Sequence, residues 1–337
     1  MSPTIKDIAK ELGISYSSVS RALNGKKGVS EETRKDIEDK ARDLGYQPND
    51  LARGLVNKVS KTIGVIIPDI TNPFFSEIVK GIIEASKKEN YDIFLCVSNW
   101  DANREEAYLK ALRKKQVDGI IIKPARDQDV NIYKEIKLPL IVLESWNKLE
   151  NACAISLNNK KGGYIAAKHL MDCGYKNIGF LAGKEESLSS KERKDGWLSA
   201  LEEGGMLEKE PNVIYTDFSI EGGYKATREL LEMDPSIDAI FAANDVIALG
   251  ALQRLSEMNI KVPEQIGVIG FDNISYSRLP QIMLTTVNQP VYEMGTIAFE
   301  TIVAIIQEKD VLELKSIVLE PELIVRTTTR REKNEKN

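Results

Sequence analysis

The side chains able to carry out catalysis are few in this sequence, and they form no catalytic pattern. There is one histidine, His169, and the three cysteines, Cys96, Cys153 and Cys173, form no CxxC pair. A histidine-based triad, a metal site and a disulfide framework are therefore disfavoured. No GxGxxG follows an apolar run, and no phosphate-binding P-loop is present. We therefore expect no enzymatic activity, no metal and no cofactor.

A second set of side chains is suited to reading hydrogen-bonding surfaces. It lies on the outer face of a helix expected after Ser15, and it contains no acidic residue. Side chains of this kind read base edges in the DNA major groove, where arginine makes a forked contact with guanine. With the flanking cap residues, the candidate DNA contacts here are Thr4, Ser15, Tyr16, Ser17, Ser20, Arg21 and Asn24.

Three short helices over residues 4–45 would position this face. The expected N-caps are Thr4, with Asp7 as capping-box partner, Ser15 and Ser30. Ala9, Gly13 and Val19 supply the small residue, the turn glycine and the branched apolar plug of a helix-turn-helix. The alternative is a plain three-helix capping module.

Residues 47–60 form a short segment, QPNDLARGLVNKVS, with two interpretations. It is either a simple linker or a helix that folds on DNA and inserts a leucine into the minor groove. The candidate DNA contacts in it are Asn49, Arg53 and Leu55.

Charge separates the two ends of the chain. Residues 1–60 hold eleven Lys and Arg against nine Asp and Glu, a net charge of +2, whereas the remainder has a net charge of −7. This asymmetry permits nucleic-acid contact at the N-terminal end.

The large C-terminal piece alternates apolar runs with helical patterns. Helical patterns lie for example at 104–114, 161–172 and 245–258, and Gly162 and Gly163 in the second are attributed to close packing. The apolar runs are 63–67, 93–97, 119–122, 140–144, 178–182, 213–215, 239–242 and 266–271. This order predicts two doubly wound α/β subdomains with parallel sheets. A ligand is expected between them, at the carboxyl ends of the strands.

Polar and aromatic side chains near these strand ends are the candidate ligand contacts. Polyol ligands need acceptors, forked donors and aromatic faces. The polar candidates are Asp69, Asn72, Asn99, Glu144, Arg193, Asn244 and Asp272, and the aromatic ones include Phe75, Trp100, Phe218 and Phe271. At most one of Phe74 and Phe75 is expected to face the cleft, and Asp245 is expected to cap a helix.

These motifs resemble the LacI/GalR family of bacterial transcription regulators. Residues 4–55, TIKDIAKELGISYSSVSRALNG and onward, are similar to its DNA-binding headpiece. The resemblance continues to residue 328 through IGVIIPDITNPFF, QVDGIII, GYKNIGFLAG, FAANDVIALGAL, GVIGFDN and LTTVNQP. It implies a helix-turn-helix headpiece and a core similar to periplasmic binding proteins.

The resemblance also implies roles for individual residues. Tyr16, Ser17 and Arg21 match base-contacting positions, and Leu55 matches the intercalating hinge leucine. Arg193, Asn244 and Asp272 match ligand-binding positions, and Phe218 and Gln289 fall near further ones. Ser17 is shorter than its counterparts, and the stretch Glu144-Ser145-Trp146 departs from the Asp-Arg pair that is common after this strand in the family.

The implied domains are a headpiece (1–47), a hinge (48–60), an effector-binding core (61–330) and a charged tail (331–337). The core divides into an N-subdomain, about 61–157 and 291–318, and a C-subdomain, about 158–290 and 319–330.

The expected function is a cytoplasmic transcriptional repressor, a homodimer on a palindromic operator in double-stranded DNA. A small effector, a sugar or sugar derivative, would control it from the core. One alternative is control by a phosphocarrier protein corepressor, because the NPFF and DLARGL stretches resemble that branch of the family. Another is a solute-binding protein of a transport system. No apolar run is long enough to cross a membrane.

Overall fold

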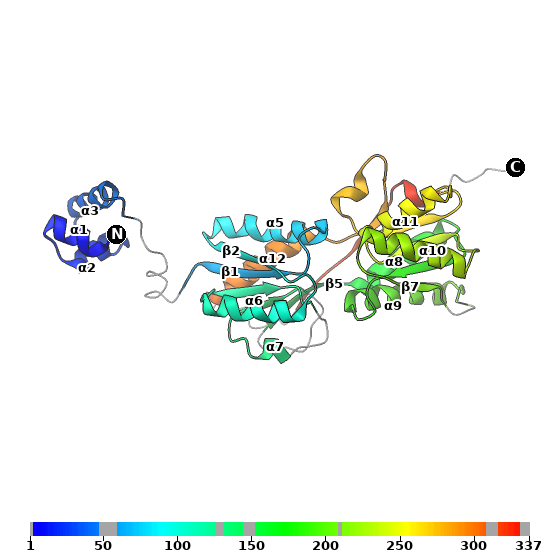
Figure 1. Ribbon diagram of the computed structural model, residues 1–337, viewed down its shortest axis with the longest axis horizontal. Coiled ribbons are helices and arrows are strands. Elements are labelled where there is room, and N and C mark those ends of the chain that lie inside the picture. Colours follow the sequence, from blue (N-terminus) through cyan, green and yellow to red (C-terminus); the bar gives the residue numbers. More distant parts are fainter. Residues whose placement is uncertain are drawn as a thin grey trace. The chain divides into compact units, whose positions relative to one another are not determined.

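The computed structural model describes residues 3–46, 59–125, 131–143, 152–207, 211–307 and 316–330. The chain divides into two units, residues 1–60 and residues 61–337 (Figure 1). The candidate DNA contacts Asn49, Arg53 and Leu55 and the candidate ligand contact Glu144 lie outside the described residues.

The N-terminal unit contains three helices, α1 (Ile5–Leu12), α2 (Tyr16–Leu23) and α3 (Glu31–Asp43). The expected caps are confirmed: Thr4 donates its backbone N–H to Asp7, and Ser15 and Ser30 accept backbone N–H groups in the first turns of α2 and α3. Gly13 ends α1 in the left-handed conformation, with φ 63°. The shared core of the three helices is Ile8, Ala9, Val19, Ala22, Ile37 and Ala41.

The first lobe of the second unit is a six-stranded sheet in the order β11-β5-β4-β3-β1-β2, with all strands parallel. Ile63 of β1 lies opposite Ile93 on one side and Gly119 on the other. The elements are β1 (Thr62–Ile67), α5 (Pro73–Lys88), β2 (Asp92–Val97), α6 (Ala102–Lys114), β3 (Gly119–Ile122), α7 (Asn131–Lys134), β4 (Leu140–Val142), β5 (Ala152–Leu157), α12 (Val291–Ile306) and β11 (Ser316–Leu319).

The second lobe is a six-stranded sheet in the order β12-β10-β9-β8-β6-β7, in which β12 alone runs antiparallel to its neighbour. The elements are α8 (Asn159–Asp172), β6 (Ile178–Ala182), α9 (Leu188–Glu203), β7 (Val213–Tyr215), α10 (Ile220–Met233), β8 (Ala239–Ala242), α11 (Asp245–Glu257), β9 (Gly267–Asp272), η1 (Ser275–Arg278), β10 (Thr285–Asn288), β12 (Glu322–Ile324) and η2 (Thr327–Thr329). The chain therefore passes between the lobes three times: after β5, after β10 and between β11 and β12.

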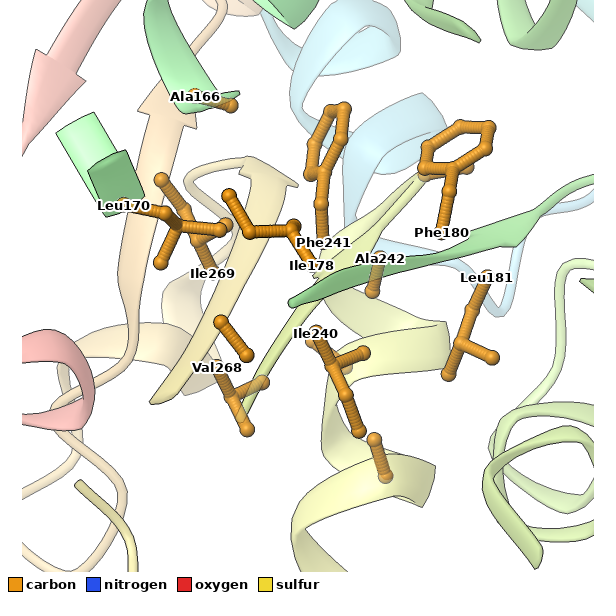
Figure 2. Packing of buried hydrophobic residues seen from close by; sticks show 14 of the residues in the cluster. Ala166, Leu170, Ile178, Phe180, Leu181, Ile240, Phe241, Ala242, Val268 and Ile269 are labelled. Atoms are coloured by element: carbon orange, nitrogen blue, oxygen red, sulfur yellow. The ribbon is translucent and has the colours of Figure 1, made fainter. Parts of the chain in front are cut away.

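Burial explains why the central strands are continuous apolar runs. In the second lobe, Phe180 of β6, Phe241 of β8 and Ile269 of β9 are fully buried and pack with Leu170 of α8 (Figure 2). Helices cover both faces of each sheet, so inward and outward side chains of these strands both avoid water. The expected doubly wound α/β core is confirmed.

Two helices of the second lobe cross at glycines. A Cβ atom on Gly163 of α8 would lie 2.0 Å from the carbonyl oxygen of Arg193 in α9, and one on Gly196 would lie 1.9 Å from that of Lys160. A Cβ on Gly162 would lie 2.5 Å from the Phe271 ring. Close packing is therefore the reason for Gly162 and Gly163, as expected, and it fixes where α9 places Arg193.

Across the described ranges of the chain, every helix is too short or too polar to span a bilayer.

Candidate functional site

A cavity of about 70 Å³ lies between the two lobes of the core, near the carboxyl ends of the strands. This is the position expected for a ligand in doubly wound folds. The predicted ligand residues that line it are Asn72, Phe75, Trp100, Arg193, Phe218, Asn244, Asp272 and Gln289.

Arg193 of α9 is held on three sides in the cavity wall. Its Nε donates to Oδ1 of Asn159 at 2.9 Å, and its Nη1 donates to the carbonyl oxygen of Ala243. The guanidinium lies over the Phe271 ring, 3.7 Å from the ring centroid. Because the planar group is fixed before a ligand arrives, little side-chain entropy is lost on binding.

Asp272 ends β9 and faces the arginine. Its Oδ1 lies 3.6 Å from Nη1 of Arg193 and accepts a hydrogen bond from Nε2 of Gln289. Burial raises the pKa of Asp272 to about 7, although Arg193 and Gln289 both act to lower it. Near neutral pH this carboxyl group therefore exchanges between a hydrogen-bond donor and an ionised acceptor.

Two asparagines combine helix capping with a place in the cavity wall. Oδ1 of Asn72 accepts the backbone N–H of Phe74 at the start of α5, at 3.0 Å. Oδ1 of Asn244 accepts the backbone N–H of Ile247 at the start of α11, at 2.9 Å. Because the oxygens are used in capping, each asparagine offers its amide NH₂ group to a ligand.

Aromatic rings form one side of the cavity. Phe74 and Phe75 both line it, so the expectation that at most one would do so is wrong. The two rings meet edge to face, with centroids 5.0 Å apart, and the first turn of α5 itself borders the cavity. Phe271 does not line it; this ring is buried beneath Arg193 instead.

Some candidates near the strand ends are not brought to the cavity. The carboxylate of Asp69 accepts hydrogen bonds from the backbone and hydroxyl of Thr71, both at 2.7 Å, and so closes a turn before α5. Asn99 is exposed in a left-handed conformation, with φ 54°. Neither residue lines the cavity.

The expectation that Asp245 caps α11 is also wrong. The extended residue before the helix, Asn244, is the cap, and Asp245 is already helical. The Asp245 carboxylate accepts the backbone N–H of Ile274 at 2.9 Å and the hydroxyl of Thr286. Burial, aided by the charge of Asp272, raises the pKa of Asp245. Asp245 thus joins α11 to β10 and to the segment that follows β9.

Several polar lining residues were not among the candidates: Lys123, Ser156, Asn159, Ser187 and Ser189. Lys123 follows β3 directly, and Asn159 begins α8 two residues after β5. Lys123 and Asn159 thus lie at or just after the ends of strands, as Asn72 and Asp272 do, and a polar side chain at the end of a strand is the sequence signal that marks all four.

The candidate base-reading residues share the exposed side of α2. Tyr16 is 54% exposed, and Ser17, Arg21 and Asn24 are also exposed, whereas Ser20 is half-buried. The first turn of α2 contains no acidic residue. This surface is neutral to positive and carries donors, which suits contact with DNA.

Intramolecular bonds already hold part of this surface in place. The hydroxyl of Ser15 lies 2.8 Å from that of Ser17, and Nδ2 of Asn24 donates to the carbonyl oxygen of Ser20 at 2.7 Å. The hydroxyl of Thr4 donates to Asp7 at 2.7 Å. Tyr16 and Arg21 are exposed and take part in none of these three bonds.

A helix-turn-helix unit followed by a two-lobed core, with an interlobe cavity lined by polar and aromatic side chains, defines the class of ligand-responsive DNA-binding regulators. Comparison with known protein families supports this class. Residues 4–49 match the model of bacterial regulatory proteins of the lacI family, and residues 60–322 match that of periplasmic binding proteins and the sugar-binding domain of the LacI family. The chain belongs to the LacI family of bacterial transcriptional regulators and is not an enzyme.

Individual relatives cover nearly the whole chain. The transcriptional regulator RegA of Clostridium saccharobutylicum is 34% identical over 98% of this chain and 100% of its own. The ribose operon repressor of Halalkalibacterium halodurans is 33% identical over 99% of each. Among solved structures, the lac repressor dimer bound to operator and an anti-inducer matches with a TM-score of 0.87 and 26% identity, over 98% of this chain and 99% of that one.

Proposed function

We propose that this regulator is a repressor that binds a near-palindromic operator as a homodimer and is controlled by a small polar effector in the interlobe cavity. The effector is a sugar or sugar derivative. The observation that carries this proposal is the buried pair of Arg193 and Asp272 in the cavity wall, opposite an aromatic face.

The lining supports a polyol ligand. The guanidinium of Arg193, the carboxyl group of Asp272 and the amide groups of Asn72, Asn244 and Gln289 would bond to hydroxyl groups. Phenylalanine rings would cover the C–H surface of a sugar. The name of the ribose operon repressor, a relative over nearly the full length, fits a sugar as effector.

The exposed face of α2 supports DNA reading. We assign Tyr16, Ser17, Ser20, Arg21 and Asn24 to base and nearby contacts, with Thr4 and Ser15 at the backbone. The hinge, residues 48–60, would add Asn49, Arg53 and Leu55, with Leu55 inserted in the minor groove. We expect this to take place in the cytoplasm, where bacterial DNA is located.

A dimer is supported by one edge of the first lobe. β2 is the edge strand of its sheet, and its Phe94 and Leu95 are 42% and 40% exposed. An exposed apolar edge strand invites association. The structurally similar lac repressor is a dimer on its operator, and a single headpiece buries too little surface for tight selectivity.

The test begins with a thermal-shift screen of sugars and nucleobases against the full-length protein. Operator sites selected from random DNA are then used to measure affinity with and without each stabilising compound. Asp272→Ala should keep basal operator affinity and lose the ligand response, because Asp272 lies in the cavity wall and not in the headpiece. An unchanged response in this variant would place the effector elsewhere.

A phosphocarrier protein corepressor is the remaining alternative. Operator binding that is unaffected by every small molecule and responds to an added phosphocarrier protein would favour it. The match of residues 4–49 to the DNA-binding model argues against a solute-binding protein of a transport system.

A further inference from the structure

Trp100, which follows β2, contacts the second lobe across one end of the cavity. Its ring stacks on that of Phe218, with centroids 6.0 Å apart and planes at 20°. Nζ of Lys184, also from the second lobe, lies 5.3 Å from the Trp100 ring centroid. Phe218 and Lys184 follow β7 and β6, so this contact joins the two lobes through side chains alone.

The first lobe holds Trp100 in a strained conformation. Asn99 and Trp100 both have positive φ, 54° and 60°, which residues other than glycine rarely adopt. The turn is fixed on both sides, because Ser98 donates its N–H to Ile67 at 2.9 Å and Asp101 donates to Ser98 at 3.1 Å. Such strain persists only where the surroundings enforce it, and it is common at ligand clamps.

The partner ring is also fixed. A Cβ atom on Gly183 would lie 2.2 Å from the Phe218 ring, so this ring rests directly on the backbone after β6. On its other side, Trp100 meets Phe75 edge to face, with centroids 6.0 Å apart.

The stack of Trp100 on Phe218 limits the length of the interlobe cavity. The cavity of about 70 Å³ is several times what one buried water needs, about 10–15 Å³, but it is small for a ligand site. A second ring attached on the side of Trp100 and Phe218 would have to extend past the end that these two residues close. It could do so only by separating them.

We propose that Trp100 is a specificity-determining residue, which closes one end of the cavity by stacking on Phe218 and restricts the effector to the size of a single sugar ring. This inference rests on the proposed function, because it takes a sugar as the effector.

The first experiment needs no effector. In a Trp146→Phe background, the remaining tryptophans are Trp100 and the fully buried Trp197. Phe218→Leu should increase quenching of the fluorescence by acrylamide roughly two-fold, because Trp100 loses the ring that covers one face. Quenching equal to that of the background protein would show that the stack is not formed in solution and would overturn the inference.

The second experiment measures size selectivity. Thermal shifts of the full-length protein are recorded with pentoses, hexoses and disaccharides of the same hexoses, for wild type, Trp100→Ala, Trp100→Phe and a control, Tyr215→Ala. Tyr215 is an exposed aromatic residue of β7 outside the cavity. Wild type and the control should respond to monosaccharides only. Trp100→Ala should gain a disaccharide response, and Trp100→Phe should remain close to wild type.

The outcomes separate this inference from the proposed function. If wild type binds disaccharides as well as monosaccharides, or if Trp100→Ala keeps the wild-type preference, Trp100 does not set the size limit while the sugar effector stands. If neither wild type nor Trp100→Ala responds to any monosaccharide or disaccharide, the sugar effector itself is rejected, and the inference about Trp100 is rejected with it.

Discussion

Asp272 shows how one buried residue makes the stability of the core depend on pH. Its carboxyl group lies in the cavity wall, and burial raises its pKa to about 7, compared with about 3.9 for an exposed aspartate. The folded protein therefore holds a proton that the unfolded chain releases between these pH values. The favourable contribution is complete below about pH 4 and is lost as the pH rises through about 7.

Asp272→Asn should remove this dependence, because asparagine does not titrate in this range. The free energy of unfolding of wild type relative to the variant should fall between about pH 5 and about pH 7 and then level off. Urea unfolding of both proteins across that range measures it. Asp234→Asn is the control: serine and asparagine donors lower the pKa of Asp234, so its effect should be constant over the same range. Parallel curves for wild type and Asp272→Asn would contradict the raised pKa.

Arg21 is the single residue from which we expect the largest contribution to DNA sequence specificity. It projects from the exposed face of α2, and a forked contact with guanine is worth about 1–3 kcal/mol of discrimination. Arg21→Ala should weaken operator binding by about that amount and relax the preference at one base pair. Fluorescence anisotropy with the selected operator and single-base variants measures both. Arg42→Ala removes the same charge from the exposed end of α3, where the side chain is 78% exposed, and should change selectivity little.

At the scale of secondary-structure elements, the crossing of α8 and α9 determines where Arg193 lies in the cavity wall. Gly163 and Gly196 allow the two backbones to approach, and Phe271 supports the guanidinium of Arg193 from the sheet. The position of one side chain in the cavity therefore depends on small residues elsewhere in the lobe.

Gly163→Ala should destabilise the core by about 1–3 kcal/mol, because the new methyl group meets a backbone oxygen that has little room to move. The gain in helix propensity, about 1 kcal/mol, opposes this but is smaller. Thermal unfolding measures the stability, and the ligand response reports the displacement of Arg193. Lys168→Ala, on the exposed face of α8, should leave both nearly unchanged. A stability equal to that of wild type would show that α9 shifts at little cost.

At the scale of the whole molecule, the proposed dimer couples ligand and DNA. A ligand shifts the equilibrium between two arrangements only by its difference in affinity for them, and coupling free energies are commonly about 1–3 kcal/mol. Two headpieces on one operator turn such a shift into a change of spacing between half-sites.

Phe94→Asp should shift the protein from dimer to monomer, because it places a charge on the exposed edge strand β2. Sedimentation at micromolar concentration measures the change.

Wild type should also bind an operator lengthened by about 5 base pairs more weakly, since the half-sites would then face opposite sides of the helix. A stable wild-type monomer on a single half-site would reject the dimer.

Local chemistry made most of the elements predictable. Cap residues such as Ser15 and Ser30 act within one helical turn, and the apolar runs of β1, β6 and β9 are continuous because both faces of those strands are buried. The apolar-run criterion missed β10, because Thr285 and Thr286 interrupt its pattern. The hydroxyl groups of these threonines can be buried because Thr329 and Asp245 form hydrogen bonds with them.

The sequence by itself also determined the helix-turn-helix, the two α/β lobes and the position of the cavity between the lobes. Spacing and strand-end rules are local, and family motifs mark Arg193 and Asp272. Only the tertiary structure decided that Asp245 bonds to Ile274 and Thr286 and that Trp100 meets Phe218. Each of these depends on which side chains the lobes bring together over long separations in the chain, and no pattern of neighbouring residues records that.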